Sequence, residues 1–219
     1  MAIAPISLDG ELIGSLNQGD PSPERFHPGL DTVLLERLAL KVSLCLSNVT
    51  AHEKLRFFAF HDPLTGLLNR RALDKALARE FSRAIRYHRP LSIVFIDLNH
   101  FKQVNDTYGH ETGDTVLQHL ASILMQEKRE TDIVARFAGD EFVTVLADTV
   151  PDEADRFICR IEELVQDPVP IAGKFIPIRF SYGIASTQDG GYKDAHALLK
   201  AADTRLYQVK QKNKKRRLD

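Results

Sequence analysis

Two acidic positions of this sequence lie where strands of a sheet are expected to end. Asp97 directly follows residues 91–96, a nearly continuous apolar and β-branched run that predicts a strand buried on both faces. Asp140 lies in a short turn between two further apolar runs, so the two carboxylates converge if these strands are neighbours. Adjacent carboxylates require a cation, and hard oxygen ligands, including the carbonyl of Leu98, favour Mg²⁺ or Mn²⁺. The pattern therefore indicates a metal site, with solvated turn carboxylates as the alternative.

The segments around these acids alternate between helical and extended patterns, in the order α-β-α-β-β-α-β-α from residue 61 onward. Asn69 is placed to cap the first of these helices, and Pro90 ends it. Further helices are expected near residues 112–126, 152–164 and 195–210, and strands near residues 91–96, 133–137, 142–146 and 175–185. This order predicts an α/β (α+β) sandwich in which helices flank a central mixed β-sheet.

The first 60 residues have a different pattern. Apolar residues on both sides of Asp9-Gly10 predict a β-hairpin, and residues 19–29 are rich in Pro and Gly and are expected to form a loop. A helix then starts near Asp31-Thr32 and continues to Pro63. Its apolar residues alternate three and four apart, which is a heptad-like stripe that includes Leu35, Leu38, Val42, Cys45 and Val49. The helix either packs on its own domain or, as we favour, pairs with its copy in a homodimer.

Composition limits the classes of protein that fit. The 219 residues (24.7 kDa) are 43% hydrophobic and 27% charged, which excludes a disordered or fibrous chain. A net charge of −1 gives no bias toward nucleic acid or a membrane surface. Two distant cysteines do not make a disulfide framework, no apolar run approaches the roughly 20 residues of a bilayer span, and no signal peptide follows Met1. We expect a cytoplasmic protein with no membrane span and no specific nucleic-acid partner.

Several motifs in the same order resemble the diguanylate cyclases of the GGDEF family. They are HDPLTGLLNRR at 61–71, DLNHFKQVNDTYGHETGD at 97–114, RFAGDEF at 136–142, FSYGIA at 180–185 and ADTRLY at 202–207. The resemblance covers residues 60–215 and implies a palm-like nucleotidyl cyclase fold for a domain at 61–219. It also implies that two GTP molecules are condensed into cyclic di-GMP and pyrophosphate across a homodimer. Residues 1–60 weakly resemble the end of a GAF-like sensor domain followed by a linker helix.

The resemblance assigns roles to the acids. Asp97, Asp140 and the carbonyl of Leu98 resemble ligands of two Mg²⁺ or Mn²⁺ ions per active site, and such ions activate an attacking hydroxyl and stabilise a leaving phosphate. Glu141 resembles the second acid of the signature, near the nucleophilic 3′-hydroxyl, and which acid acts as the base stays open. Further assignments of the same kind are Asn105 and Asp114 as guanine readers, Lys102 in catalysis, Lys210 and Lys214 on the triphosphate, and His100, Phe101 and Gly139 in substrate binding.

Simpler interpretations exist for single residues of this set. Asp114 is an acceptor for the N1 and N2 donors of guanine that adenine does not match, but it also suits the first turn of a helix. Asn105 suits a turn cap, and any one lysine suits a solvated surface. Only within the motif do these residues indicate nucleotide binding.

Three positions depart from the family pattern. Ala138 replaces the first glycine of the signature, Asn99 stands where many members carry a third acid, and Lys214 stands where members often carry an arginine. None of these changes removes a proposed metal ligand, although Lys214 lacks the guanidinium fork of arginine. They leave open a second hypothesis, a catalytically silent module that binds GTP or cyclic di-GMP and signals to a partner.

Arg129 and Asp132 have the spacing of the family's product-inhibition motif, Arg-x-x-Asp, upstream of the signature turn. An arginine can bond the Hoogsteen edge of guanine while the aspartate accepts from the base. An ordinary ion pair between residues three apart is the alternative. The resemblance thus implies feedback inhibition by cyclic di-GMP.

Overall fold

The computed structural model describes residues 1–22, 32–171 and 173–215, and the chain divides into two compact units, residues 1–59 and 60–219. The expected helix start at Asp31 lies outside the described residues. Among the described residues, no helix combines the length and apolar character that crossing a bilayer requires.

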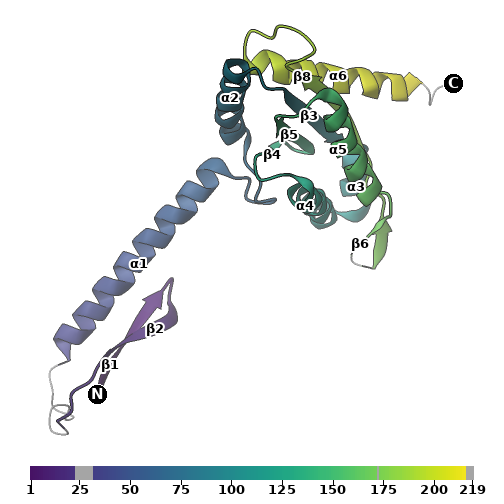
Figure 1. Ribbon diagram of the computed structural model, residues 1–219. Helices are drawn as coiled ribbons and strands as arrows, with labels where there is room; N and C mark the ends of the chain where they lie inside the picture. The colour runs from purple at the N-terminus through teal and green to yellow at the C-terminus, as the bar shows by residue number, and fades with distance from the viewer. Residues whose placement is uncertain (23–31, 172, 216–219) are drawn as a thin grey trace. The chain divides into compact units, whose positions relative to one another are not determined.

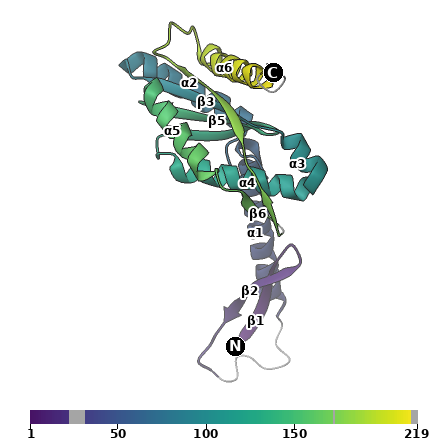
Figure 2. The same ribbon diagram turned by 90° about the vertical axis from the view of Figure 1, so that its right-hand side faces the viewer.

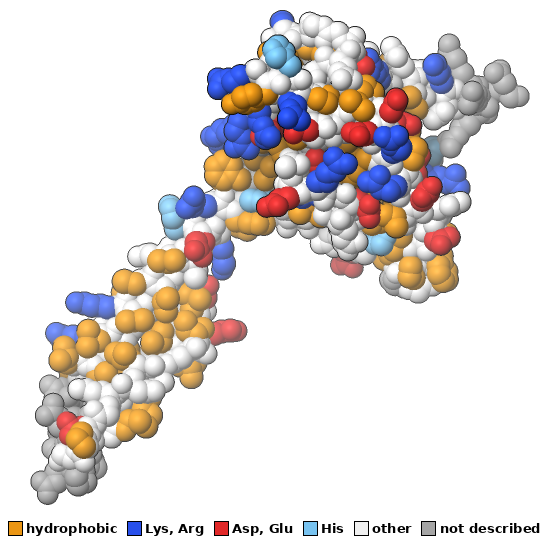
Figure 3. Space-filling model, viewed as in Figure 1, with side chains coloured by type: hydrophobic (Ala, Val, Ile, Leu, Met, Phe, Trp, Pro, Cys, Tyr) orange, Lys and Arg blue, Asp and Glu red, His pale blue; other side chains and the backbone are white. Residues whose placement is uncertain are grey.

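The N-terminal unit consists of the expected hairpin and helix. Strands β1 (Ala2–Leu8) and β2 (Glu11–Gln18) pair antiparallel, and Asp9 and Gly10 both have positive φ, as their turn requires. Helix α1 (Val33–Phe60) buries little besides Leu35 and Ala39, which pack against the hairpin. Most apolar side chains of α1 therefore remain exposed, and hydrophobic groups cover much of the visible surface of this unit (Figure 3).

The second unit is built on a four-stranded sheet with the strand order β4-β5-β3-β8. Its strands are β3 (Leu91–Leu98), β4 (Ile133–Ala138), β5 (Glu141–Ala147) and β8 (Phe180–Ser186). The α/β sandwich is confirmed, but neighbouring strands pair antiparallel, whereas a mixed sheet was expected. Strand β3 is buried along its whole length because helices cover both faces of the sheet, which does not require parallel neighbours.

Helices cover the two faces of this sheet and form two hydrophobic cores (Figures 1 and 2). Helices α2 (Arg70–Tyr87) and α6 (Ala195–Lys215) pack on one face, and α4 (His110–Glu127) and α5 (Pro151–Leu164) on the other. The cap of α2 is confirmed, because the Asn69 side chain accepts a hydrogen bond from the backbone N–H of Ala72 at 3.0 Å.

Two parts of this unit were not expected from the sequence. Helix α3 (Phe101–Tyr108) follows β3 after two residues, and a small hairpin of β6 (Val169–Ile171) and β7 (Lys174–Ile176) precedes β8. Helix α3 has only eight residues and buries none of them completely, although Phe101 and Val104 pack against the core, so its apolar stripe is too short to identify a helix from the sequence.

Candidate functional site

The sheet brings the predicted acids to one edge. In the antiparallel register of β3 and β5, Asp97 lies directly opposite Glu141, so the two side chains project to the same face. Asp140 occupies the turn between β4 and β5, and its carbonyl accepts a hydrogen bond from the backbone N–H of Leu98 at 3.3 Å. Asp97 is 9% exposed. The convergence expected from the sequence is therefore present in the structure.

These acids carry negative charge that their surroundings leave partly unbalanced. Burial, followed by the nearby charge of Asp97, raises the pKa of Asp140. Burial also raises the pKa of Glu141, and Asp97 and Asp140 raise it further. A cation placed among these carboxylates would be stabilised, because it would reduce the repulsion between their negative charges and the free-energy penalty of burying them.

Lys210 of α6 provides a positive charge next to these carboxylates. Its Nζ lies 2.5 Å from Oδ2 of Asp97. Within the described residues, no three His, Cys, Asp or Glu side chains form a group that could hold a metal ion by themselves. Mg²⁺ commonly binds through one or two carboxylates together with water and substrate phosphates, so this donor set of hard oxygens fits a metal that arrives with a nucleotide.

A cavity of about 960 Å³ opens beside the acids. Among the predicted site residues, its lining includes Asp97, Leu98, His100, Lys210 and Lys214. Residues that were not predicted also line it, from the end of α5 and from the segment before β8. The volume is that of a typical small-molecule site, and its lysines give one wall positive charge.

Helices α3 and α4 meet at the predicted guanine readers. A Cβ on Gly113 would collide with the amide oxygen of Asn105 and would lie 3.2 Å from the ring of Phe101, so only glycine allows this approach. The Asn105 oxygen is buried and has no hydrogen-bond partner in the described structure. Asp114 follows Gly113 directly and is exposed. An unpartnered buried acceptor is unfavourable by about 1–3 kcal/mol, which a ligand donor can offset.

Phe101, Lys102, Asn105 and Asp114 do not line the cavity. Lys102 is exposed in the first turn of α3. The structure thus groups Asn105, Asp114 and Phe101 at the α3–α4 contact and the acids with Lys210 at the sheet edge, and the assignment of Lys102 stays a prediction.

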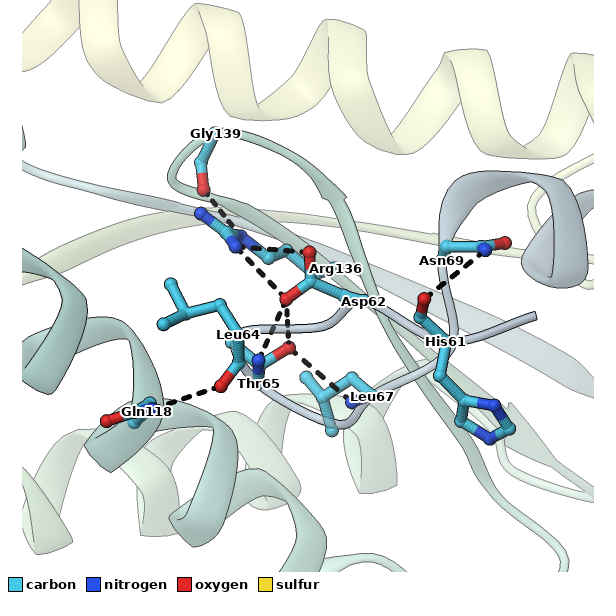
Figure 4. A network of polar contacts seen from close by, with 9 residues as sticks. All are labelled: His61, Asp62, Leu64, Thr65, Leu67, Asn69, Gln118, Arg136 and Gly139. Atoms are coloured by element: carbon cyan, nitrogen blue, oxygen red, sulfur yellow. Dashed lines mark hydrogen bonds and ion pairs between the residues drawn. The ribbon is translucent and has the colours of Figure 1, made fainter. Parts of the chain in front are cut away.

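The signature turn is fixed by a polar network that starts at Asp62 (Figure 4). Arg136 donates from Nη1 to both carboxylate oxygens of Asp62, at 3.0 and 3.1 Å, and from Nε to the carbonyl of Gly139 at 2.8 Å. Thr65 donates to the same carboxylate from its backbone N–H and its hydroxyl, at 2.9 and 2.7 Å. The network ties residue 62, near the start of the unit, to the turn that carries Asp140.

Asp62 is held as an anion. Burial alone would raise its pKa, but the hydrogen bonds from Thr65 and the bond and charge of Arg136 outweigh burial and lower it. Gly139 has a φ of +51°, which suits glycine, whereas Ala138 before it is not among the residues with positive φ. The methyl group of Ala138 is therefore accommodated at the first signature position without backbone strain.

The predicted product site has an asymmetric structure. Asp132 is buried, and its carboxylate accepts from the backbone N–H groups of Arg129 at 2.9 Å and Ala147 at 3.3 Å. The Arg129 side chain is exposed and takes part in no ion pair among the described residues. Asp132 thus stabilises the turn before β4, and Arg129 is the member of the pair that is available to a ligand.

Comparison with known proteins identifies the second unit. Residues 59–216 match the family model of the diguanylate cyclase GGDEF domain. The chain belongs to this family. It is 37% identical over 155 residues to the diguanylate cyclase DosC of Escherichia coli K12, covering 71% of this chain and 34% of DosC. It is 36% identical over 161 residues to the cyclic di-GMP phosphodiesterase NbdA of Pseudomonas aeruginosa, covering 73% of this chain and 20% of NbdA.

Solved GGDEF structures have the same fold. The coiled coil and GGDEF domain of DgcB from Caulobacter crescentus, in complex with c-di-GMP, matches with a TM-score of 0.69 at 26% identity, over 83% of this chain and 95% of that one. This chain spans only a fifth to a third of the length of the curated relatives NbdA and DosC. The family therefore describes the GGDEF domain, and the activity of the whole protein is a separate question.

Two features of the GGDEF domain were missed by sequence reasoning. Asp62 lies in a motif that supported the family resemblance, but nothing local indicated that its partner would be Arg136, 74 residues later. Arg179 lines the cavity and immediately precedes β8, where a charged residue beside a buried strand was the available signal.

Proposed function

We propose that the GGDEF domain at residues 60–219 is a diguanylate cyclase that condenses two GTP molecules into cyclic di-GMP and pyrophosphate. The observation that carries the proposal is the position of Asp97 opposite Glu141 and beside Asp140, with Asp97 lining a cavity that has a cationic wall. The diguanylate cyclase DosC, at 37% identity, supports it.

Asp97, Asp140 and the carbonyl of Leu98 would hold two Mg²⁺ or Mn²⁺ ions. When bound, these ions lower the pKa of the attacking hydroxyl and neutralise charge on the leaving pyrophosphate. Asp140 and its neighbour Glu141 are carboxylates whose negative charge is poorly compensated, which favours a divalent cation beside them. Glu141 is on the same face as Asp97, where it can orient the 3′-hydroxyl, and the choice of base stays open.

The nucleotide would be held at both of its ends. Asn105 and Asp114 would bind guanine, and the unpartnered oxygen of Asn105 supports a ligand that brings a donor. Lys210 and Lys214 would bind the phosphates at the cavity wall, which His100 also lines. Phe101, Gly139 and Lys102 do not line this cavity, and their part in substrate binding rests on the family motif alone. Because Lys210 pairs with Asp97, it neutralises this acid before the metal arrives and can then shift to phosphate.

Condensation of two nucleotides needs two such sites facing each other, so the proposal includes a homodimer. The stripe of α1 supports it, since Leu38, Val42 and Val49 are 44%, 36% and 55% exposed. Pairing of two α1 helices would bury them and raise the effective concentration of one bound GTP for the other. We also propose that residues 1–60 are the end of a GAF-like sensor that sets this pairing.

Feedback inhibition by cyclic di-GMP is a further part of the proposal. The exposed Arg129 guanidinium is available to a guanine base, and the backbone bonds of Asp132 fix the turn that presents it. The DgcB structure in complex with c-di-GMP supports binding of this ligand within the family.

The alternative is a silent GGDEF module that binds GTP or cyclic di-GMP and signals to a partner. Lys214 and the tight contact of Lys210 with Asp97 favour it, because a lysine that stays on Asp97 would compete with a metal. NbdA, named for phosphodiesterase activity, shows that GGDEF relatives occur in proteins with other activities.

One assay separates the two functions. Purified protein is incubated with GTP and Mg²⁺ over a range of protein concentrations, and products are identified by chromatography and mass spectrometry. A cyclase yields cyclic di-GMP with a specific activity that rises with protein concentration, because each subunit binds one of the two GTP molecules and only the dimer can join them. GTP binding without product at any concentration would favour the silent module.

A further inference from the structure

Arg179 is placed beside the candidate phosphate site by the backbone itself. Its carbonyl accepts a hydrogen bond from the N–H of Asn99 at 2.7 Å, which extends the pairing of β3 with β8 past the end of both strands. Asn99 follows the metal-site residues Asp97 and Leu98 directly. Arg179 therefore lies next to the loop on which the proposed metal and phosphate contacts depend.

The same register determines the face on which Arg179 lies. Ser181 is opposite Asp97, and its hydroxyl donates to the Asn99 side chain at 2.8 Å. Side chains alternate along an extended chain, so Arg179 is on the face of Ser181 and Asp97, which is the face that α6 covers. Arg179 and Asp97 both line the cavity, which also extends to Ile178 and Phe180 at the same end of the sheet.

Helix α6 brings its own cations to the same place. It runs along β8, where a Cβ on Gly183 would meet the backbone of Ala202 and Leu206. One turn beyond Leu206 lies Lys210, which contacts Asp97, and one further turn places Lys214 in the cavity lining. Helix α6 thus runs antiparallel to β8, so Lys210 and Lys214 lie at the same end of the sheet as Arg179.

Within the described part of the chain, three cationic side chains line this cavity, namely Lys210, Lys214 and Arg179, and only Lys210 is paired with a carboxylate. Lys210 is paired with Asp97, whereas Arg179 and Lys214 take part in no ion pair among the described residues. Glu162 is the other acid in the lining. Two free cations at the mouth of a metal site suit an anion with more charge than a single carboxylate, such as a polyphosphate.

We propose that Arg179 is a binding residue for the terminal phosphates of the nucleotide. This assignment rests on the proposed function and extends it. The guanidinium of Arg179 can donate two parallel hydrogen bonds to phosphate oxygens, which a lysine at position 214 cannot do. Arg179 thereby supplies a bidentate contact beside the two lysines of α6, and it distinguishes a triphosphate from a monophosphate.

The test compares ligands that differ in their terminal phosphates. The probes are 3′-deoxy-GTP, which keeps the triphosphate but lacks the attacking hydroxyl, and GMP, each titrated calorimetrically with Mg²⁺ into the full chain. The variants are Arg179→Ala and Arg179→Lys. Lys212→Ala is the matched control, because Lys212 is an exposed cation on α6 between the two cavity lysines and does not line the cavity.

We expect Arg179→Ala to weaken 3′-deoxy-GTP binding by roughly tenfold to a hundredfold while GMP affinity stays within about twofold. Arg179→Lys should recover part of the loss, and Lys212→Ala should change neither affinity. Equal losses for both ligands, or unchanged 3′-deoxy-GTP affinity in Arg179→Ala, would overturn the assignment and leave the proposed function standing. A wild-type protein that does not bind 3′-deoxy-GTP would overturn both.

Discussion

Asp140 is a residue whose environment opposes its charge. Burial and Asp97 raise its pKa, so the folded protein holds a proton there more tightly than the unfolded chain does. The resulting stability is present at low pH and is lost as the pH rises through the folded-state pKa. At neutral pH without metal, the ionised Asp140 therefore destabilises the domain, which is the opposite of its proposed benefit to catalysis.

Asp140→Asn should accordingly stabilise the metal-free protein at pH 7. The amide has similar shape and no charge to desolvate beside Asp97. Thermal unfolding in a chelating buffer measures the effect, and the gain should shrink as the pH is lowered and the wild-type carboxyl takes up its proton. A lower melting temperature for Asp140→Asn at pH 7 would show that this carboxylate is already compensated.

Asp62→Asn is the matched substitution, and we expect it to destabilise the protein at pH 7, whereas Asp140→Asn stabilises it. The pKa of Asp62 is lowered in the folded state, so its contribution is present above the unfolded pKa and is lost as the pH falls through the folded value. Loss of the bonds to Arg136 and Thr65 should reduce the unfolding free energy at pH 7 by about 1–3 kcal/mol. Denaturant unfolding at pH 7 and pH 3 checks this, and a loss that is equal at both would exclude the charge as its cause.

At the level of elements, the contact of α3 with α4 carries the guanine-binding part of the proposal. Gly113→Ala places a methyl group against the amide of Asn105, so the helices must separate or the amide must turn. We expect a destabilisation of about 1–3 kcal/mol and weaker GTP binding. Calorimetric titration measures it, and inorganic pyrophosphate, which has no base, should bind Gly113→Ala and wild type alike. An equal loss for pyrophosphate would place the defect outside the guanine contact.

Elements with strong local patterns were predictable, and contacts between distant elements were not. The buried run of β3, the Asn69 cap and the Asp9-Gly10 turn each have a local physical cause, and all three are present as expected. A mixed sheet was expected where the four strands pair antiparallel, because burial of β3 on both faces depends on the covering helices and does not determine the direction of its neighbours. The convergence of Asp97 with Asp140 was predicted only on condition that β3 and β5 are neighbours, which the tertiary fold determines.

The partners of Lys210, Arg136 and Arg179 could not be predicted from spacing. Each lies far in sequence from the group that it contacts, as for Lys210 with Asp97 and Arg179 with Asn99. The side chains of Lys210 and Arg136 are long enough to reach several positions, so residue type alone does not select among them, and the contact of Arg179 is made by its backbone carbonyl. The family resemblance supplied the roles of single residues, and the structure supplied which of them lie together.

For the whole molecule, activity should depend on pairing of α1. Leu38→Glu together with Val49→Glu introduces negative charges into the exposed apolar stripe of α1. In a dimer paired through this stripe, the charges of the two copies would repel each other. We expect sedimentation analysis to show a monomer and specific activity to fall at micromolar protein. Lys41→Glu, at another exposed position of α1, is the control and should leave both unchanged. A double variant that stays dimeric and active would exclude α1 as the dimer contact.

The central claim is that Asp97 and Asp140 bind divalent ions against GTP. The most direct measurement is the rate of cyclic di-GMP formation from GTP as Mg²⁺ is varied, for wild type and for Asp140→Asn with its fold verified by circular dichroism. The account predicts Mg²⁺-dependent product from wild type and a rate lower by on the order of 10³-fold, about 4 kcal/mol of barrier, in Asp140→Asn. Equal rates for the two proteins, or product without any divalent ion, would contradict it.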